Sequence, residues 1–126
     1  MNRIDKLLKK ADAALITHRL VDDNNILDDV FDGYLASFGA TVIISGLIQT
    51  LAVYEADKKR KMVLNAIASV SGIEHNNVSA TTGAQLLELC LNNHTNKLQL
   101  NMWREKILDV SVALKMMIRT YNFNTN

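Results

Sequence analysis

The sequence contains no proline, and only five of its 126 residues are glycine. Proline is the strongest helix breaker and glycine the next strongest, so the usual signals that interrupt helices are nearly missing. Leucine, alanine and lysine, which favour helices, are abundant. The composition therefore predicts an all-α protein.

The sequence also has only one cysteine and a net charge close to zero. The single cysteine, Cys90, excludes a disulfide within the chain. The first ten residues are charged and no apolar run follows them, so we expect no secretory signal and a cytoplasmic location. A net charge of +1 does not by itself indicate a nucleic-acid-binding protein. The length and the 48% apolar content fit one helical domain, which we expect to span residues 1–126.

The longest stretch without charge runs from Tyr34 to Tyr54, and we call it the uncharged run. It reaches the length of about 20 residues that a transmembrane helix needs. Polar side chains within it, among them Gln49, would be costly in lipid without a partner. We predict instead a central helix, starting near Ile26, that other helices cover. Gly46 would permit a kink in this helix.

Apolar periodicity predicts further helices around this centre, giving a compact bundle of about five helices. They are expected over residues 3–21 and 59–70, in a helix that begins after Thr82 and is stopped by Asn92 and Asn93, and in a last helix that carries Lys97 and the apolar residues up to Tyr121. Gly72 is a candidate C-cap glycine, and Thr82 with Gln85 forms a capping-box pair. Residues 73–80 are expected to form a loop.

The last helix carries the most regular pattern. Its apolar residues alternate in steps of three and four: Leu100, Trp103, Ile107, Val110, Leu114, Met117 and Tyr121. This heptad seam is typical of a helix that pairs with another. Four basic residues fall within a sector of about 60° beside the seam, forming a row about 33 Å long. This basic row comprises Lys97, Arg104, Lys115 and Arg119. It fits the phosphates of an extended nucleic-acid strand, an acidic face of a neighbouring subunit, or an ordinary solvated surface.

A second basic group, which we call the basic run, follows Asp57. It consists of Lys58, Lys59, Arg60 and Lys61. Such a run is usually a solvated surface or a connector, and nucleic-acid contact is the alternative. At the C-terminal end of the uncharged run it would favourably face the negative end of the helix dipole. Seven acidic residues lie between Asp22 and Asp57, so we expect the two basic groups to be unneutralised.

Chemical sites are not indicated. Five aspartates between Asp22 and Asp32 lack the glycine and the glutamate of a calcium loop, and they read as turn and capping residues. The three histidines have no zinc spacing, and His18 reads as a residue at the edge of the core. Cys90 has no basic neighbour to activate it. No nucleophile elbow or phosphate-binding glycine loop is present, so we expect no metal, no cofactor, no small-molecule substrate and no enzymatic activity.

Within the uncharged run, a tyrosine precedes a glycine-containing apolar motif by about ten residues, and the basic run follows. The positions are Tyr34, Gly46, Leu47, Thr50, Leu51 and Ala52. This pattern resembles the small helical subunit of the Cmr complex, the type III-B CRISPR effector, in which a tyrosine precedes a small-Gly-Leu-x-x-Thr-Leu-Ala-aromatic run and a basic tail follows. Family members commonly carry a Trp-Leu-Lys-Arg-Phe-like run in the last helix, whereas this chain has Ala113–Arg119 there and Trp103 earlier.

The resemblance implies a non-catalytic scaffold in antiviral defence. Copies of the family's subunit stack along guide and target RNA with basic faces toward the nucleic acid, beside other Cmr subunits. The expected RNA-contacting residues are then the basic run and the basic row. The alternative is a helical protein-interaction module that self-associates through the heptad seam.

Overall fold

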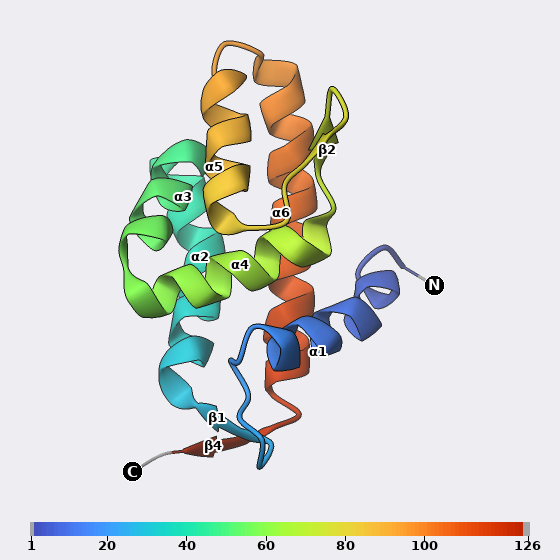
Figure 1. Cartoon of the computed structure of the whole chain (residues 1–126), viewed down its shortest axis with the longest axis vertical. Coiled ribbons are helices and arrows are strands. Elements are labelled where there is room, and N and C mark those ends of the chain that lie inside the picture. The colour runs from blue at the N-terminus through green and yellow to red at the C-terminus, as the bar shows by residue number, and fades with distance from the viewer. Residues whose placement is uncertain (1, 125–126) are drawn as a thin grey trace.

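The protein is mainly helical, and the computed structural model describes residues 2–124. A short 3₁₀ turn, η1 (Asp5–Leu7), leads into the first helix. The α-helices are α1 (Leu8–Thr17), α2 (Asp29–Ser45), α3 (Leu47–Ala56), α4 (Lys58–Ser71), α5 (Gly83–Asn92) and α6 (Lys97–Ile118). They pack around one hydrophobic core, and Figure 1 shows their arrangement. The predicted all-α bundle is confirmed.

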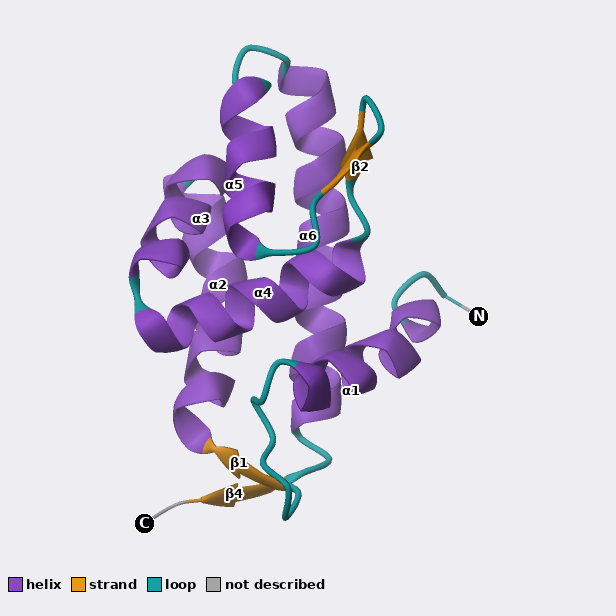
Figure 2. Cartoon of the chain, viewed as in Figure 1, coloured by secondary structure: helices purple, strands orange, loops and turns teal. Residues whose placement is uncertain are grey.

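Two short strand pairs were not predicted (Figure 2). Strand β1 (Ile26–Asp28) pairs in parallel with β4 (Asn122–Asn124), so the predicted helix start near Ile26 is wrong. Strands β2 (Glu74–His75) and β3 (Val78–Ser79) form a hairpin where we expected a loop. The two residues between them, Asn76 and Asn77, have φ of 50° and 64°. Asparagine tolerates this left-handed conformation, which a tight hairpin turn requires.

The uncharged run is not one helix. At Gly46, φ is 95° and ψ is 160°, a conformation essentially restricted to glycine, and α2 ends there. The chain then reverses so that α3 packs against α2. The kink expected at Gly46 is therefore a complete break.

The helix at the centre of the bundle is α4. It packs against each of the other five α-helices. Its buried residues are Val63, Leu64, Ala66, Ile67, Ala68, Val70 and Ser71. The uncharged run, in contrast, leaves Ile43 and Ile44 of α2 66% and 83% exposed. The prediction that the uncharged run forms the central helix is therefore wrong, and α4 takes that place.

The heptad seam of α6 lies inside the fold. Trp103, Ile107, Val110 and Leu114 are buried, because α6 packs against α1, α2 and α4. Pairing of two copies through this seam would require these side chains to leave the core.

The remaining cap predictions are confirmed. Gly72 ends α4 in the left-handed conformation, and Thr82 and Gln85 form the complete capping box of α5. Asp28 caps α2 by accepting a hydrogen bond from the Val30 amide.

Candidate nucleic-acid interface

The basic run forms the first turn of α4, and α3 has already ended at Ala56. Asp57 is the N-cap of α4, and its carboxylate accepts a hydrogen bond from the Arg60 amide at 3.0 Å. The run therefore follows the C-terminal end of α3, as expected, but it also lies at the positive end of the α4 dipole, which was not expected. Four cations in this position are unfavourable for the helix, both through the dipole and through like-charge repulsion along the turn.

Carboxylates offset much of this charge. Lys59 lies 3.1 Å from Asp28, Lys61 lies 3.3 Å from Glu55, and Arg60 lies 3.8 Å from Asp57. The Val30 amide and then the Lys59 ammonium lower the pKa of Asp28. The expectation that the basic run is unneutralised is therefore wrong, because its acidic neighbours come from α2, α3 and the cap of α4. Within residues 2–124, Lys58 has no carboxylate in ion-pair distance.

Arg60 is placed differently from the three lysines. Its guanidinium carbon lies 4.6 Å from the centre of the Tyr34 ring and 6.0 Å from that of Tyr54, which is a cation–π arrangement. The Tyr54 hydroxyl donates a hydrogen bond to the Tyr34 carbonyl at 2.7 Å and lies 3.1 Å from the Ser37 hydroxyl. Sequence reasoning did not identify this group, although the two tyrosines mark the ends of the uncharged run.

The basic row follows the boundary between α6 and α2. Arg119, just after α6, lies 3.9 Å from Asp32 in the first turn of α2. Arg104 pairs with Glu105 at 3.2 Å and lines a cleft of about 320 Å³ at the corner between α2 and α3. Lys97 is exposed at the start of α6, and Lys115 is half-buried. The row thus carries acidic partners at two of its four positions.

The two basic groups approach each other only at one end. Lys59 and Arg119 pair with Asp28 and Asp32, which lie one turn apart where α2 begins. Lys97 lies near the other end of α6, 22 residues before Arg119 in the sequence. The eight predicted residues therefore do not form one compact site, and the basic run is the denser group.

A further basic surface was missed. Lys6, Lys9 and Lys10 are exposed on and just before α1, and none has a carboxylate in ion-pair distance within the described part of the chain. Arg3, nearby, is bound to Asp109 at 2.7 Å. The lysines were visible in the charged first ten residues, but the sequence did not show which of them would be paired.

The residues considered for chemistry have structural roles. His18 is half-buried, its Nε2 lies 3.1 Å from the Ser69 hydroxyl, and burial lowers its pKa. Cys90 is buried, which raises the pKa of its thiol to about 12. The Asp22 carboxylate accepts hydrogen bonds from the Asn24 and Ile26 amides, as expected of a turn residue. Among the described residues, no group of three or more His, Cys, Asp or Glu side chains could hold a metal ion. No described helix is long and apolar enough to cross a membrane.

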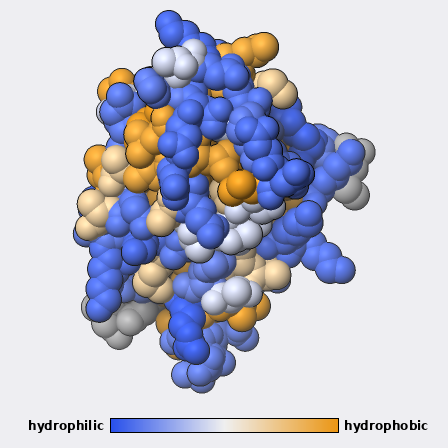
Figure 3. Space-filling model, turned by 45° about the horizontal axis from the view of Figure 1, so that its top comes forward, coloured by the Kyte–Doolittle hydropathy of each residue, from blue (hydrophilic) through white to orange (hydrophobic). Residues whose placement is uncertain are grey.

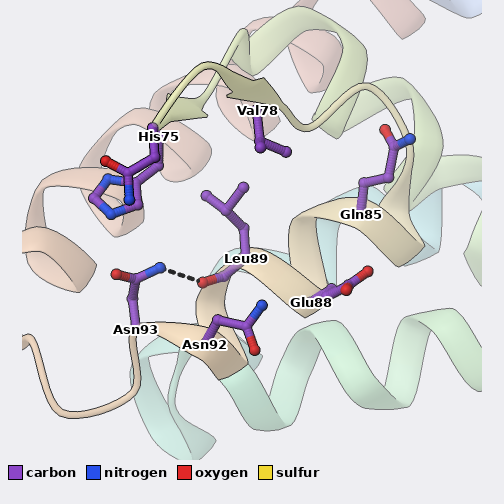
Figure 4. Close-up of a pocket in the computed structure, with 8 residues that line it drawn as sticks. His75, Val78, Gln85, Glu88, Leu89, Asn92 and Asn93 are labelled. Atoms are coloured by element: carbon purple, nitrogen blue, oxygen red, sulfur yellow. Dashed lines mark hydrogen bonds between the residues drawn. The ribbon is translucent and has the colours of Figure 1, made fainter.

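A cleft of about 450 Å³ lies between the β2–β3 hairpin and α5 (Figure 4). Several of its polar side chains already serve the fold. The Gln85 side-chain oxygen accepts from Thr81 and Thr82, and the Asn93 amide donates to the Leu89 carbonyl. The His75 ring packs edge-on against Trp103 at 5.4 Å between ring centres. The cleft therefore lacks a convergent set of free catalytic groups.

The positions that carry the family resemblance mostly stabilise the fold. Leu47, Thr50 and Leu51 are buried in α3. The Thr50 hydroxyl donates to the Gly46 carbonyl at 2.8 Å, which secures the first turn after the break.

Comparisons of the chain with protein families, with characterised proteins and with solved structures find no match. A proposal of function therefore depends on the residues of the chain and on the motif in the uncharged run.

Proposed function

We propose that the chain is a non-catalytic small subunit of a type III-B CRISPR effector complex and binds the phosphate backbone of guide or target RNA in the cytoplasm. Its partners are then other Cmr subunits, copies of itself and RNA, and it acts by positioning RNA rather than by cutting it. The motif in the uncharged run and the compact helical fold support this proposal.

The observation that carries it is the basic run in the first turn of α4. Lys58–Lys61 weaken the helix that contacts every other helix, since cations at a helix N-terminus are unfavourable. Natural sequences break such local rules mainly at functional sites. An RNA phosphate would relieve the repulsion among these side chains and would also face the positive end of the dipole.

Protein contacts have a different surface available. The outer side of α2 between Gly33 and Ser45 carries no charge, and Ile43 and Ile44 project from it. Val112 and Met116 of the neighbouring α6 are 40% and 47% exposed. Adjacent exposed apolar residues such as Ile43 and Ile44 are a feature of protein–protein contact surfaces. On the face shown in Figure 3, hydrophilic residues predominate and hydrophobic ones are visible between them.

The test is RNA binding by a reconstituted effector complex at several salt concentrations. Lys58, Lys59 and Lys61 are replaced together by alanine. Each lost phosphate contact on a single strand changes the slope of log affinity against log salt by about 0.7, so the slope should flatten by about 2. RNA sequence should not matter, because phosphate contacts carry no base specificity.

The matched control replaces Lys6, Lys9 and Lys10 by alanine. It removes the same charge from exposed lysines outside the basic run and should leave the slope unchanged. If both triple variants change the slope equally, net charge and not the basic run determines binding. If neither changes it while the complex still binds RNA, the chain is not a phosphate-contacting subunit.

The second candidate is a protein-interaction module. The exposed isoleucines of α2 favour it, and the buried heptad seam does not. Replacing Ile44 by aspartate should then reduce the oligomer mass seen by sedimentation, with the chain still folded. A monomeric wild-type chain in the absence of other subunits would argue against self-association.

A further inference from the structure

The guanidinium of Arg60 is held in place without use of its hydrogen-bond donors. It stacks on Tyr34 at 4.6 Å, and the nearest carboxylate, that of Asp57, is 3.8 Å away, beyond hydrogen-bond distance. Within residues 2–124 no side-chain hydrogen bond from Arg60 is formed, whereas its backbone amide is bound to Asp57. The side chain is 38% exposed, so part of it is accessible from solvent.

The Tyr34 ring beneath Arg60 belongs to a group of residues joined by packing and hydrogen bonds. Tyr54 is buried and packs edge-on against Tyr34 and Phe38, with ring centres 6.5 Å and 5.1 Å apart. Its hydroxyl donates to the Tyr34 carbonyl, which the Ser37 hydroxyl also contacts at 3.3 Å. Burial raises the pKa of Tyr54, which keeps this hydroxyl protonated. Helices α2, α3 and α4 therefore meet under the guanidinium.

A planar guanidinium whose carbon lies 4.6 Å from the centre of a ring keeps N–H groups that are directed away from that ring. Those groups match two oxygens of a phosphate, which a lysine ammonium does not. A side chain already fixed in this way loses little conformational entropy on binding. Lys58, Lys59 and Lys61 contribute charge around it.

We infer that Tyr34 is a positioning residue, which holds the Arg60 guanidinium as a preformed two-pronged donor for one phosphate group of an RNA strand. The inference rests on the proposed function and adds to it a distinction within the basic run: Arg60 contributes geometry and the three lysines contribute charge. Tyr34 acts through Arg60 and does not itself contact the phosphate.

The experiment measures binding of polyuridylic acid to the full chain by fluorescence anisotropy at low and moderate salt. Arg60→Lys keeps the charge and removes the planar donor, so affinity should fall about tenfold while the salt slope stays the same. Tyr34→Leu keeps the apolar bulk and removes the ring, and should cost about the same. The double variant should lose no more than either single variant, because both changes remove one interaction.

Two matched controls accompany these variants. Tyr34→Phe retains the ring and should bind like the wild type. Lys58→Arg, in the same helical turn, should not increase affinity, since no ring positions that side chain. The Nε–H signal of Arg60 in a nitrogen–proton NMR spectrum should shift when RNA is added, and a purely structural role for Arg60 would not produce this shift.

The outcomes separate the inference from the proposed function. If the wild type binds RNA with a steep salt dependence but Arg60→Lys and Tyr34→Leu bind equally well, the inference fails and the proposed function stands. If the wild type shows no salt-dependent binding, both fail. If Tyr34→Leu does not fold, Arg60→Lys and the Arg60 NMR signal still decide, because an unchanged affinity together with an unshifted signal overturns the inference.

Discussion

The uncharged run and α4 differ in charge and in burial, and the region without charge is the more exposed of the two. The run, now divided into α2 and α3, has no charged residue from Tyr34 to Tyr54, yet Ile43 and Ile44 are among the most exposed apolar side chains of the molecule. Helix α4 begins with four cations, yet it contacts all five other helices. In this fold, the absence of charge in a segment does not show that the segment lies at the centre of the bundle.

The reason lies in side-chain size and position. After its first turn, α4 has buried residues on most of its circumference. Two of them, Ala66 and Ala68, are small and allow neighbouring helices to approach closely. Its cations are confined to one end, where they reach solvent and acidic partners. In α2 a single apolar face, including Leu35 and Phe38, satisfies the core. Between Gly33 and Ser45 the opposite face has no charges, and the fold leaves it exposed.

The largest effect should come from Ile67 in α4. Ile67→Ala removes a fully buried side chain from the helix that all others contact, and should lower the free energy of unfolding by about 2–5 kcal/mol. Ile44→Ala is the matched change in the uncharged run and should alter it by less than about 0.5 kcal/mol, because Ile44 is 83% exposed. Urea denaturation followed by circular dichroism measures both. Equal losses would show that the outer face of α2 is covered in solution.

Gly46 and Gly39 provide the next comparison, within the uncharged run itself. Gly46→Ala should cost about 1–3 kcal/mol, because φ is 95° and ψ is 160° there. Gly39→Ala should be neutral or stabilise by up to about 1 kcal/mol, since the added Cβ would lie 3.8 Å from Leu108, an ordinary contact. The difference between their urea midpoints tests the break directly. A stable Gly46→Ala variant would indicate that α2 and α3 join as one helix.

Local signals predicted most of the fold, because helix caps and periodicity act over a few residues. The capping box at Thr82, the C-cap at Gly72 and the buried seam of α6 follow from neighbouring positions. The break at Gly46 did not follow, since glycine is compatible with both a helix and a turn. The pairing of β1 with β4 joins segments nearly 100 residues apart, and no local pattern indicates it.

The candidate site was predictable in composition but not in geometry. The basic run was visible as four consecutive residues, whereas its carboxylate partners come from Asp28, Glu55 and Asp57. The stacking of Arg60 on Tyr34 joins residues 26 positions apart and requires the reversal of the chain at Gly46. A residue's charge is a property of the sequence, but its neutralisation is a property of the fold.

A smaller effect is expected where α3 is joined to α2 by hydrogen bonds. Tyr54→Phe removes the donor to the Tyr34 carbonyl and the contact with Ser37, while ring packing against Phe38 remains. The loss in unfolding free energy should be about 1 kcal/mol, typical of one buried hydrogen bond. Ser37→Ala is the control, and it should cost less because the Tyr54–Tyr34 bond persists. No change in Tyr54→Phe would mean that packing alone joins the two helices.

The smallest effect appears only at alkaline pH and concerns Tyr121, which follows α6 and bonds through its hydroxyl to the Asp12 carboxylate of α1. This hydrogen bond, followed by burial, raises the pKa of Tyr121 to about 12 from an ordinary value near 10. The folded state thus prefers the protonated hydroxyl, so its contribution is complete below pH 10 and declines as the pH rises toward 12. Because Tyr121 is only half-buried, solvent screens much of this contribution.

Tyr121→Phe should therefore show a shallower decline of the urea midpoint between pH 9 and 11 than the wild type. The decline that remains in Tyr121→Phe should become shallower again when Tyr54→Phe is added, because burial also raises the pKa of Tyr54, and the buried thiol of Cys90, whose pKa is raised as well, contributes to what is left. A wild-type midpoint that is constant over this range would show that neither hydroxyl is coupled to folding.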